Sequence, residues 1–234
     1  IRLSLVGSEM CIRDRSNRIR AYSGFLLHEA LNKILLFDHE GRFLREQKKP
    51  PLIKNIHPVG DKFVGRRIYQ LQDGTTACSA IQIYDRNLKM EIEIARQEFF
   101  QQGAGAELTF DMGYDMLIFD VAKERIFVET SRKGPFIEVF DKSGRKLYRI
   151  TIPWKKIPIA ARDRRELLNY LVQDSRMQQI MKTNHITWEI LSRNFRFQYP
   201  EYYPAIRDMF IDSGRIYVKT WHRDQQGRDP VSYT

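Results

Sequence analysis

The stretch FIEVFDKSGRKLYR at residues 136–149 decides the fold, because closely similar stretches occur twice more in the chain. They are KILLFDHEGRFLRE at residues 33–46 and AIQIYDRNLKMEIE at residues 80–93. Each copy has a β-rich run, an aromatic residue followed by Asp, a short polar turn and a second alternating run. An Asp can accept hydrogen bonds from the amides of the turn that follows, and glycine in the first and third copies can take a positive φ. The copies therefore predict β-hairpins, with Asn87 as the residue that tolerates left-handed geometry in the middle one.

The spacing of the copies indicates a repeat architecture. The turn residues Asp38, Asp85 and Asp141 lie 47 and 56 residues apart, which is near the period of propeller blades with four antiparallel strands. Two further strands precede the third hairpin, so residues 116–151 are predicted to form one whole blade, and the pattern restarts at residues 205–221. We therefore predict an all-β fold, a β-propeller of four-stranded antiparallel blades that is incomplete, with about four blades or partial blades.

A segment of different character separates the last two blades. Period-2 alternation stops between Pro153 and Pro204, and residues 161–182 carry apolar side chains at helical spacing. We predict an amphipathic helix there, followed by a shorter helix from His185 to Arg193 that ends before the prolines. The predicted domain is thus a partial β-propeller over residues 16–234 with a helical insertion at residues 155–200.

The first residues do not fit this pattern. Leu5 to Arg15 are eleven consecutive residues that resemble a translated transposon adapter of the kind used to prepare sequencing libraries. We expect residues 1–15 to be a non-native, adapter-derived segment, which has to be excluded from fold reasoning. On that expectation the natural start of the protein lies upstream, and Cys78 is the only native cysteine, placed in a β-rich run as a small buried side chain.

Composition and charge narrow the classes of partner. The net charge is +10, 42% of residues are hydrophobic, and no run approaches the length of about 18 apolar residues that a membrane helix needs. A basic protein attracts anionic partners, although an evenly solvated basic surface remains an alternative. Nucleic-acid binding is not favoured, because the basic residues are dispersed and no aromatic RNA-binding motif occurs.

Two stretches carry a family resemblance. RIFVET followed by IEVFDKSGRKLYRI, and RIYVKTW after MFIDSG, resemble the bacterial six-bladed β-propellers of the NHL-repeat type. The resemblance covers most of residues 33–234, and the missing glycine of the middle hairpin and the long insertion depart from it. It implies a bacterial repeat protein, here a metagenomic fragment, that acts as a binding module in the periplasm or at the cell surface. Its motifs specify architecture and no chemistry.

The topology of a blade predicts a binding face. Strands alternate in direction, so the loop between the second and third strands leaves at the same end as the connections between blades. The insertion should therefore share a face with residues 131–135, 70–76 and 221–230, and loops on a rigid scaffold often carry binding. The candidate binding residues are Arg132, Lys133, Trp221, His222 and Arg223. Trp221 could instead pack between blades, and His222 could simply be solvated.

No catalytic signature is complete. The five histidines are scattered without ligand spacing, and the glycine-rich residues 103–113 lack the following helix that a phosphate-binding loop requires. We assign no catalytic residue, metal ligand or cofactor. The sequence favours a noncatalytic binding or scaffold propeller that recognises a protein or an anionic ligand on the face with the insertion. The alternative is a propeller hydrolase or lyase with a metal in its central channel.

Overall fold

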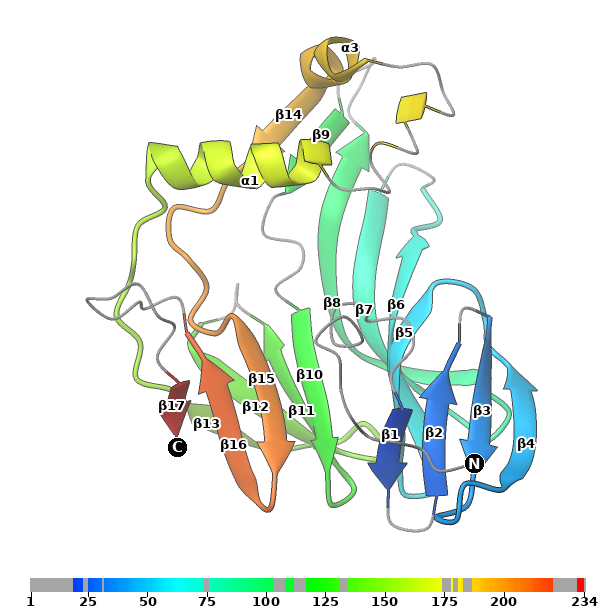
Figure 1. Ribbon diagram of the computed structural model, residues 1–234. Coiled ribbons are helices and arrows are strands. Elements are labelled where there is room, and N and C mark those ends of the chain that lie inside the picture. The colour runs from blue at the N-terminus through cyan, green and yellow to red at the C-terminus, as the bar shows by residue number, and fades with distance from the viewer. Residues whose placement is uncertain are drawn as a thin grey trace.

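Four sheets follow one another in chain order in the computed structural model (Figure 1). The structure describes residues 19–22, 25–30, 32–73, 76–102, 108–111, 117–130, 134–173, 178, 181–182, 187–220 and 231–233. We call the sheets blades 1 to 4. The predicted class, an open β-propeller arc of antiparallel blades with a helical insertion, is confirmed. The proposed adapter segment, residues 1–15, lies outside the described residues.

Blades 1 and 2 occupy the first half of the chain. Blade 1 contains β1 (Ile19–Tyr22), β2 (Phe25–Glu29), β3 (Lys33–Phe37) and β4 (Phe43–Lys48). Blade 2 contains β5 (Ile53–Val59), β6 (Lys62–Gln70), β7 (Thr76–Tyr84) and β8 (Met90–Gln102). Within each blade consecutive strands pair antiparallel. The strands of blade 2 are much the longer, so its upper part extends beyond blade 1 (Figure 1).

Blades 3 and 4 follow in the second half. Blade 3 contains β10 (Leu117–Ala122), β11 (Arg125–Thr130), β12 (Phe136–Asp141) and β13 (Lys146–Thr151). Blade 4 contains β15 (Asp208–Asp212), β16 (Arg215–Lys219) and β17 (Val231–Tyr233). The described residues of the range 116–151, which was predicted to be one whole blade, supply the four strands of blade 3, and blade 4 begins where the pattern was predicted to restart.

The three predicted hairpins share one turn geometry. In each, the Asp carboxylate accepts a hydrogen bond from the backbone N–H four residues later, with O–N distances of 2.8 Å at Asp38, 2.8 Å at Asp85 and 3.0 Å at Asp141. The backbone N–H of the same Asp donates to the carbonyl of that later residue. A β-bulge lies between the two residues that precede each Asp. An aromatic residue followed by Asp thus marks a β-hairpin with a bulge next to its turn.

The middle hairpin differs from its prediction in one respect. Asn87 lies in the turn and donates its N–H to Asp85, but the positive φ falls on Leu88, at 60°. Leu88 occupies the position of Gly41 and Gly144 in the other copies, where left-handed geometry costs a non-glycine residue about 1–2 kcal/mol. Its side chain is only 2% exposed and packs between blades 1 and 2, and burying a leucine contributes about 1.5–3 kcal/mol. Burial therefore offsets the strain.

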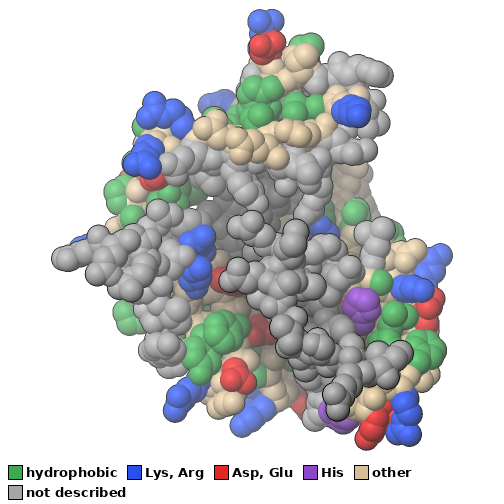
Figure 2. Space-filling view, in the orientation of Figure 1, with side chains coloured by type: hydrophobic (Ala, Val, Ile, Leu, Met, Phe, Trp, Pro, Cys, Tyr) green, Lys and Arg blue, Asp and Glu red, His purple; other side chains and the backbone are tan. Residues whose placement is uncertain are grey.

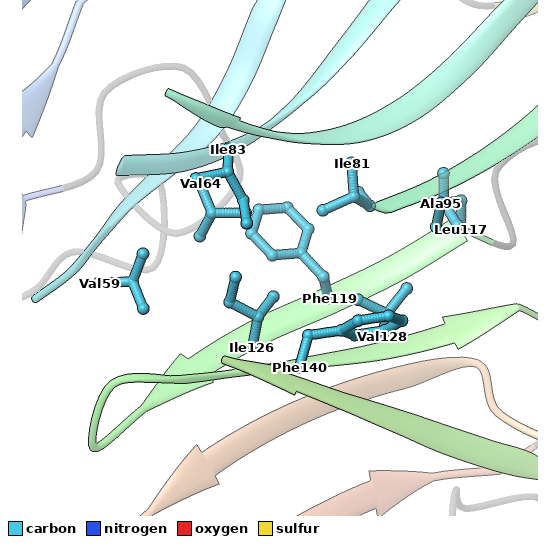
Figure 3. Packing of buried hydrophobic residues seen from close by; sticks show 10 residues of the cluster. All are labelled: Val59, Val64, Ile81, Ile83, Ala95, Leu117, Phe119, Ile126, Val128 and Phe140. Atoms are coloured by element: carbon cyan, nitrogen blue, oxygen red, sulfur yellow. The ribbon is translucent and has the colours of Figure 1, made fainter. Parts of the chain in front are cut away.

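Neighbouring blades pack face to face through three hydrophobic clusters. The cluster between blades 2 and 3 is drawn in Figure 3, where Val64, Ile81 and Ile83 face Phe119 and Ile126. A second cluster joins blades 1 and 2, and a third joins blades 3 and 4. Alternation explains these cores, because every second residue of a strand points to the same face. A central blade such as blade 3 therefore buries side chains on both of its faces.

The insertion lies between β13 and β15 and spans one end of the arc. It contains α1 (Ala161–Gln173), helical residues at 178 and 181–182, α3 (Trp188–Asn194) and β14 (Phe195–Gln198). The predicted helices are present, with α3 placed slightly later than expected. Strand β14 was not predicted. It pairs in parallel with β9 (Leu108–Asp111), which lies within the glycine-rich residues 103–113 and pairs antiparallel with β8.

The tight turns within the blades, such as those that follow β3, β10 and β15, lie at the opposite end of the arc from α1 and α3 (Figure 1). We call these the hairpin end and the insertion end. At the hairpin end the turns of blades 2 and 3 meet, since the Lys142 ammonium lies 3.3 Å from the Asp61 carboxylate. The turn of β15 and β16 approaches blade 3 at the same end, where Gly214 neighbours Lys123.

Candidate binding face

The predicted binding residues all fall outside the described residues. They are Arg132, Lys133, Trp221, His222 and Arg223. They follow β11 and β16, whose preceding turns at residues 123–124 and 213–214 lie at the hairpin end. Both strands therefore run toward the insertion end. Their inclusion in a binding face stays a prediction.

The insertion concentrates positive charge. Residues 155–200 contain nine lysines and arginines and four acidic residues, a net charge of +5 in about a fifth of the chain, so they carry half of the total of +10. Basic side chains gather at the upper left of Figure 2, where Figure 1 places the start of α1. Among the described residues, Lys155, Lys156, Arg164 and Arg165 of the insertion form no salt bridge, unlike the surface pairs on blades 1 to 3. The charge of these four side chains is therefore not compensated by an ion pair in the described part of the chain.

Aromatic rings position part of this charge. The Arg164 guanidinium on α1 lies 5.6 Å from the centre of the Tyr199 ring, and the Lys156 ammonium lies 5.0 Å from the centre of the Tyr202 ring. Burial raises the pKa of the Tyr199 hydroxyl, so this ring stays neutral. A cation over an aromatic face is attracted by about 0.5–1 kcal/mol at an exposed site. These contacts join the outgoing and returning arms of the insertion.

Backbone hydrogen bonds fix the base of the insertion. Ile159 N–H donates to the Glu201 carbonyl over 3.1 Å, and Tyr203 N–H donates to the Ile157 carbonyl over 2.9 Å. Pro158 and Tyr202 form an antiparallel bridge between the same two arms. The insertion thus leaves and re-enters the propeller as a paired stem, which gives its basic residues a defined position on the blades.

The same basic and aromatic character continues onto blade 3. Arg149 lies over the Phe136 ring, with its guanidinium carbon 3.8 Å from the ring centre, and also bonds to Glu138 over 3.0 Å. Phe136 begins β12, and the predicted Arg132 and Lys133 precede it in the sequence by three or four residues. A described cation–aromatic pair therefore borders that predicted part of the face.

The inner strands supply a histidine and a carboxylate. His57 of β5 places Nδ1 3.5 Å from Oδ1 of Asp120 on β10, and its ring meets Phe119 edge-on at 5.2 Å. The other Asp120 oxygen accepts the N–H of Ile211 in blade 4 over 2.7 Å. Asp120 thus links blades 2, 3 and 4. Within the described ranges, no cluster of three or more His, Cys, Asp or Glu residues is placed to hold a metal ion.

A polar network in blade 2 escaped prediction. The Glu93 carboxylate accepts hydrogen bonds from Tyr69 at 2.5 Å, Gln82 at 2.9 Å and Arg96 at 2.6 Å. Burial alone would raise the pKa of Glu93, but these donors outweigh it and lower the pKa. Gln82 also accepts from the Tyr84 hydroxyl over 2.8 Å. The position of the polar Gln82 within the apolar run AIQIY was the sequence feature that could have indicated a buried polar network. Since each oxygen of Glu93 is occupied, the network is suited to structure.

Comparison with known proteins gives weak likenesses only. No family model and no curated protein matches the chain. Among solved structures, BamB from Moraxella catarrhalis aligns with 89% of this chain and 42% of its own, at 10% identity and a TM-score of 0.39. Kluyveromyces lactis Hsv2 aligns with 58% of this chain and 38% of its own, at 15% identity and a TM-score of 0.33.

A protein of unknown function from Bacteroides caccae is also similar, with 92% of this chain and 60% of its own aligned, 12% identity and a TM-score of 0.30. The chain therefore spans less than two thirds of the length of these structures. Similarity at this level does not establish a shared fold, so the propeller assignment rests on the sheet order and the three inter-blade cores. In the part of the chain that the structure describes, no helix is long and apolar enough to cross a membrane.

Proposed function

We propose that the protein is a noncatalytic binding or scaffold propeller that recognises a protein or an anionic ligand at its insertion end. The supporting observation is the insertion itself, which carries half of the net charge and whose two arms are joined by aromatic contacts and backbone hydrogen bonds. Such a surface favours anionic groups through its long-range potential and through direct contacts. The proposal places the chain among six-bladed propellers of the NHL-repeat type and includes Arg132, Lys133, Trp221, His222 and Arg223 in the face.

The first experiment measures binding of fluorescently labelled polyglutamate by anisotropy, with polyglutamine as the uncharged probe. We expect binding of polyglutamate only, weakening as salt screens the charges. The double variants Lys155→Glu with Arg165→Glu, and Arg132→Glu with Lys133→Glu, should each weaken binding by about tenfold or more. Arg215→Glu is the matched control, because this exposed base lies in β16 at the hairpin end.

Equal affinity for the two probes would overturn the proposal, as would an equal loss in the Arg215→Glu control. A second measurement addresses the alternative of a metal-dependent hydrolase or lyase, for which the His57 and Asp120 pair on the inner strands is the relevant observation. Elemental analysis of the purified protein checks it. Stoichiometric calcium or zinc, retained through dialysis and lost in Asp120→Asn, would favour that alternative over a binding propeller.

A further inference from the structure

A groove between blades 1 and 2 lies at the hairpin end, away from the insertion. Its volume is about 430 Å³, which falls in the range of about 300–1,000 Å³ that is usual for ligand sites. Leu36 and Leu44 of blade 1 and Pro58 and Phe63 of blade 2 form its apolar walls. Leu36 and Phe63 are buried at the base, whereas Leu44 is 55% exposed. The groove therefore offers an apolar floor that remains open to solvent along one edge.

Four charged side chains surround this floor, and two of them are already engaged. The Lys62 ammonium lies 2.7 Å from the Glu91 carboxylate, and Asp61 lies 3.3 Å from Lys142. Lys142 also holds the pKa of the Asp61 carboxyl below its usual value, so this carboxylate stays ionised and paired. The remaining two charged residues of the groove are Arg45 and Arg86. Among the described residues neither guanidinium forms an ion pair, although the charge of Arg86 also helps to lower the pKa of Asp61.

The two arginines come from different blades, and both line the groove. Arg45 lies on β4 opposite Leu36 of β3. Arg86 lies in the β7–β8 turn, whose backbone Asp85 closes. The Gln47 side chain of β4 donates to the Arg86 carbonyl over 2.8 Å, which ties that turn to blade 1. The backbone positions that carry the two arginines are therefore fixed before any ligand arrives, which lowers part of the entropy cost of binding.

We propose that this groove binds a short acidic peptide segment of a partner protein, with an aliphatic or aromatic side chain on the apolar floor and carboxylates at Arg45 and Arg86. Arginine suits this task because its planar guanidinium pairs with a carboxylate through two parallel hydrogen bonds. Two cations beside an apolar floor match a peptide that carries carboxylates next to an apolar residue. A nucleic-acid backbone would instead call for a continuous row of cations.

The test uses the full chain and two labelled peptides, one with Leu between Glu residues and one in which Gln replaces every Glu. Anisotropy should show binding of the acidic peptide alone. Arg45→Glu with Arg86→Glu should weaken it by about tenfold or more, and the milder Arg45→Gln should weaken it by a smaller factor. Arg215→Glu, at the same end of the molecule on blade 4, should change it by less than about twofold.

The outcomes separate this groove from the insertion end. Arg132→Glu with Lys133→Glu, which is expected to weaken polyglutamate binding by about tenfold or more, should leave binding of the Leu-containing peptide within about twofold. Loss of peptide binding in that variant, or unchanged binding in Arg45→Glu with Arg86→Glu, would overturn the inference. Both groove arginines are exposed, so their substitution should preserve the melting temperature. Leu44→Ser supplies a second check, because weaker peptide binding at unchanged charge is expected only if the apolar floor is used.

Discussion

The buried ion pair between blades 1 and 2 gives the sharpest test of how the blades are joined. The Lys49 ammonium lies 2.8 Å from a Glu29 oxygen, with side chains only 5% and 8% exposed. The other Glu29 oxygen accepts the Ile56 N–H of blade 2 over 3.1 Å. At 2.8 Å the Coulomb attraction is about 6 kcal/mol for an effective dielectric constant of about 20. Desolvation of both groups offsets much of this attraction.

Removing one partner leaves the other charge buried. Lys49→Met should therefore lower the free energy of unfolding by about 3–5 kcal/mol. Lys33→Met is the matched control, because the Lys33–Glu46 distance is also 2.8 Å but the side chains are 40% and 51% exposed; its expected cost is below about 1 kcal/mol. Urea unfolding followed by circular dichroism measures both. Equal costs for the two variants would refute the argument that burial makes the Lys49 pair important.

Three further predictions concern the blades. Gly144→Ala should destabilise the protein by about 1–3 kcal/mol more than Gly41→Ala. Both glycines have φ near 80°, but only at Gly144 would an added Cβ lie 2.9 Å from the Ile92 side chain. Equal melting temperatures of the two variants would contradict this prediction. Because the pKa of Glu93 is lowered in the folded protein, its ionised form stabilises the fold above the unfolded pKa of 4.5, and this stabilisation is lost as pH falls through the folded pKa. In urea titrations at decreasing pH, Glu93→Gln should therefore reduce the fall in the free energy of unfolding on the acid side. The same dependence of that free energy on pH in both proteins would count against the prediction. Asp120→Ala should cost about 1.5–3 kcal/mol and speed hydrogen exchange at the blade 4 amide it accepts from, whereas unaltered exchange there would show that the link is absent.

The hairpins could be predicted because their determinants are local. Asp38, Asp85 and Asp141 each control a turn that closes within four residues, so the aromatic-Asp phrase is sufficient to locate it. The sequence did not predict that Leu88 would take the positive φ of the middle turn in place of glycine. The energy that offsets its backbone strain comes from packing against another blade, which is not a local feature. Alternation also located the strands, since each blade buries one or both faces.

The alternation of apolar and polar residues could not predict which distant strands pair with each other. Strand β14 pairs with β9 across nearly ninety residues, with Phe195 opposite Leu108. No local sequence signal connects the two segments. The hydrogen bond from Ile56 of blade 2 to Glu29 and the groove that the two arginines share likewise depend on which blade lies next to which. Helical spacing predicted the helices of the insertion but not its share of the positive charge, and its paired stem follows from backbone hydrogen bonds between residues more than forty apart.

Both proposed surfaces require that consecutive blades lie side by side with their tight turns at one end. Zero-length carbodiimide cross-linking with mass spectrometry tests this directly, since it joins only amines and carboxylates in contact. The account predicts a cross-link between Lys142 of blade 3 and Asp61 of blade 2, which lie 3.3 Å apart, alongside the Lys33–Glu46 link within blade 1. Formation of the Lys33–Glu46 link without any Lys142–Asp61 link would contradict the arrangement of the blades.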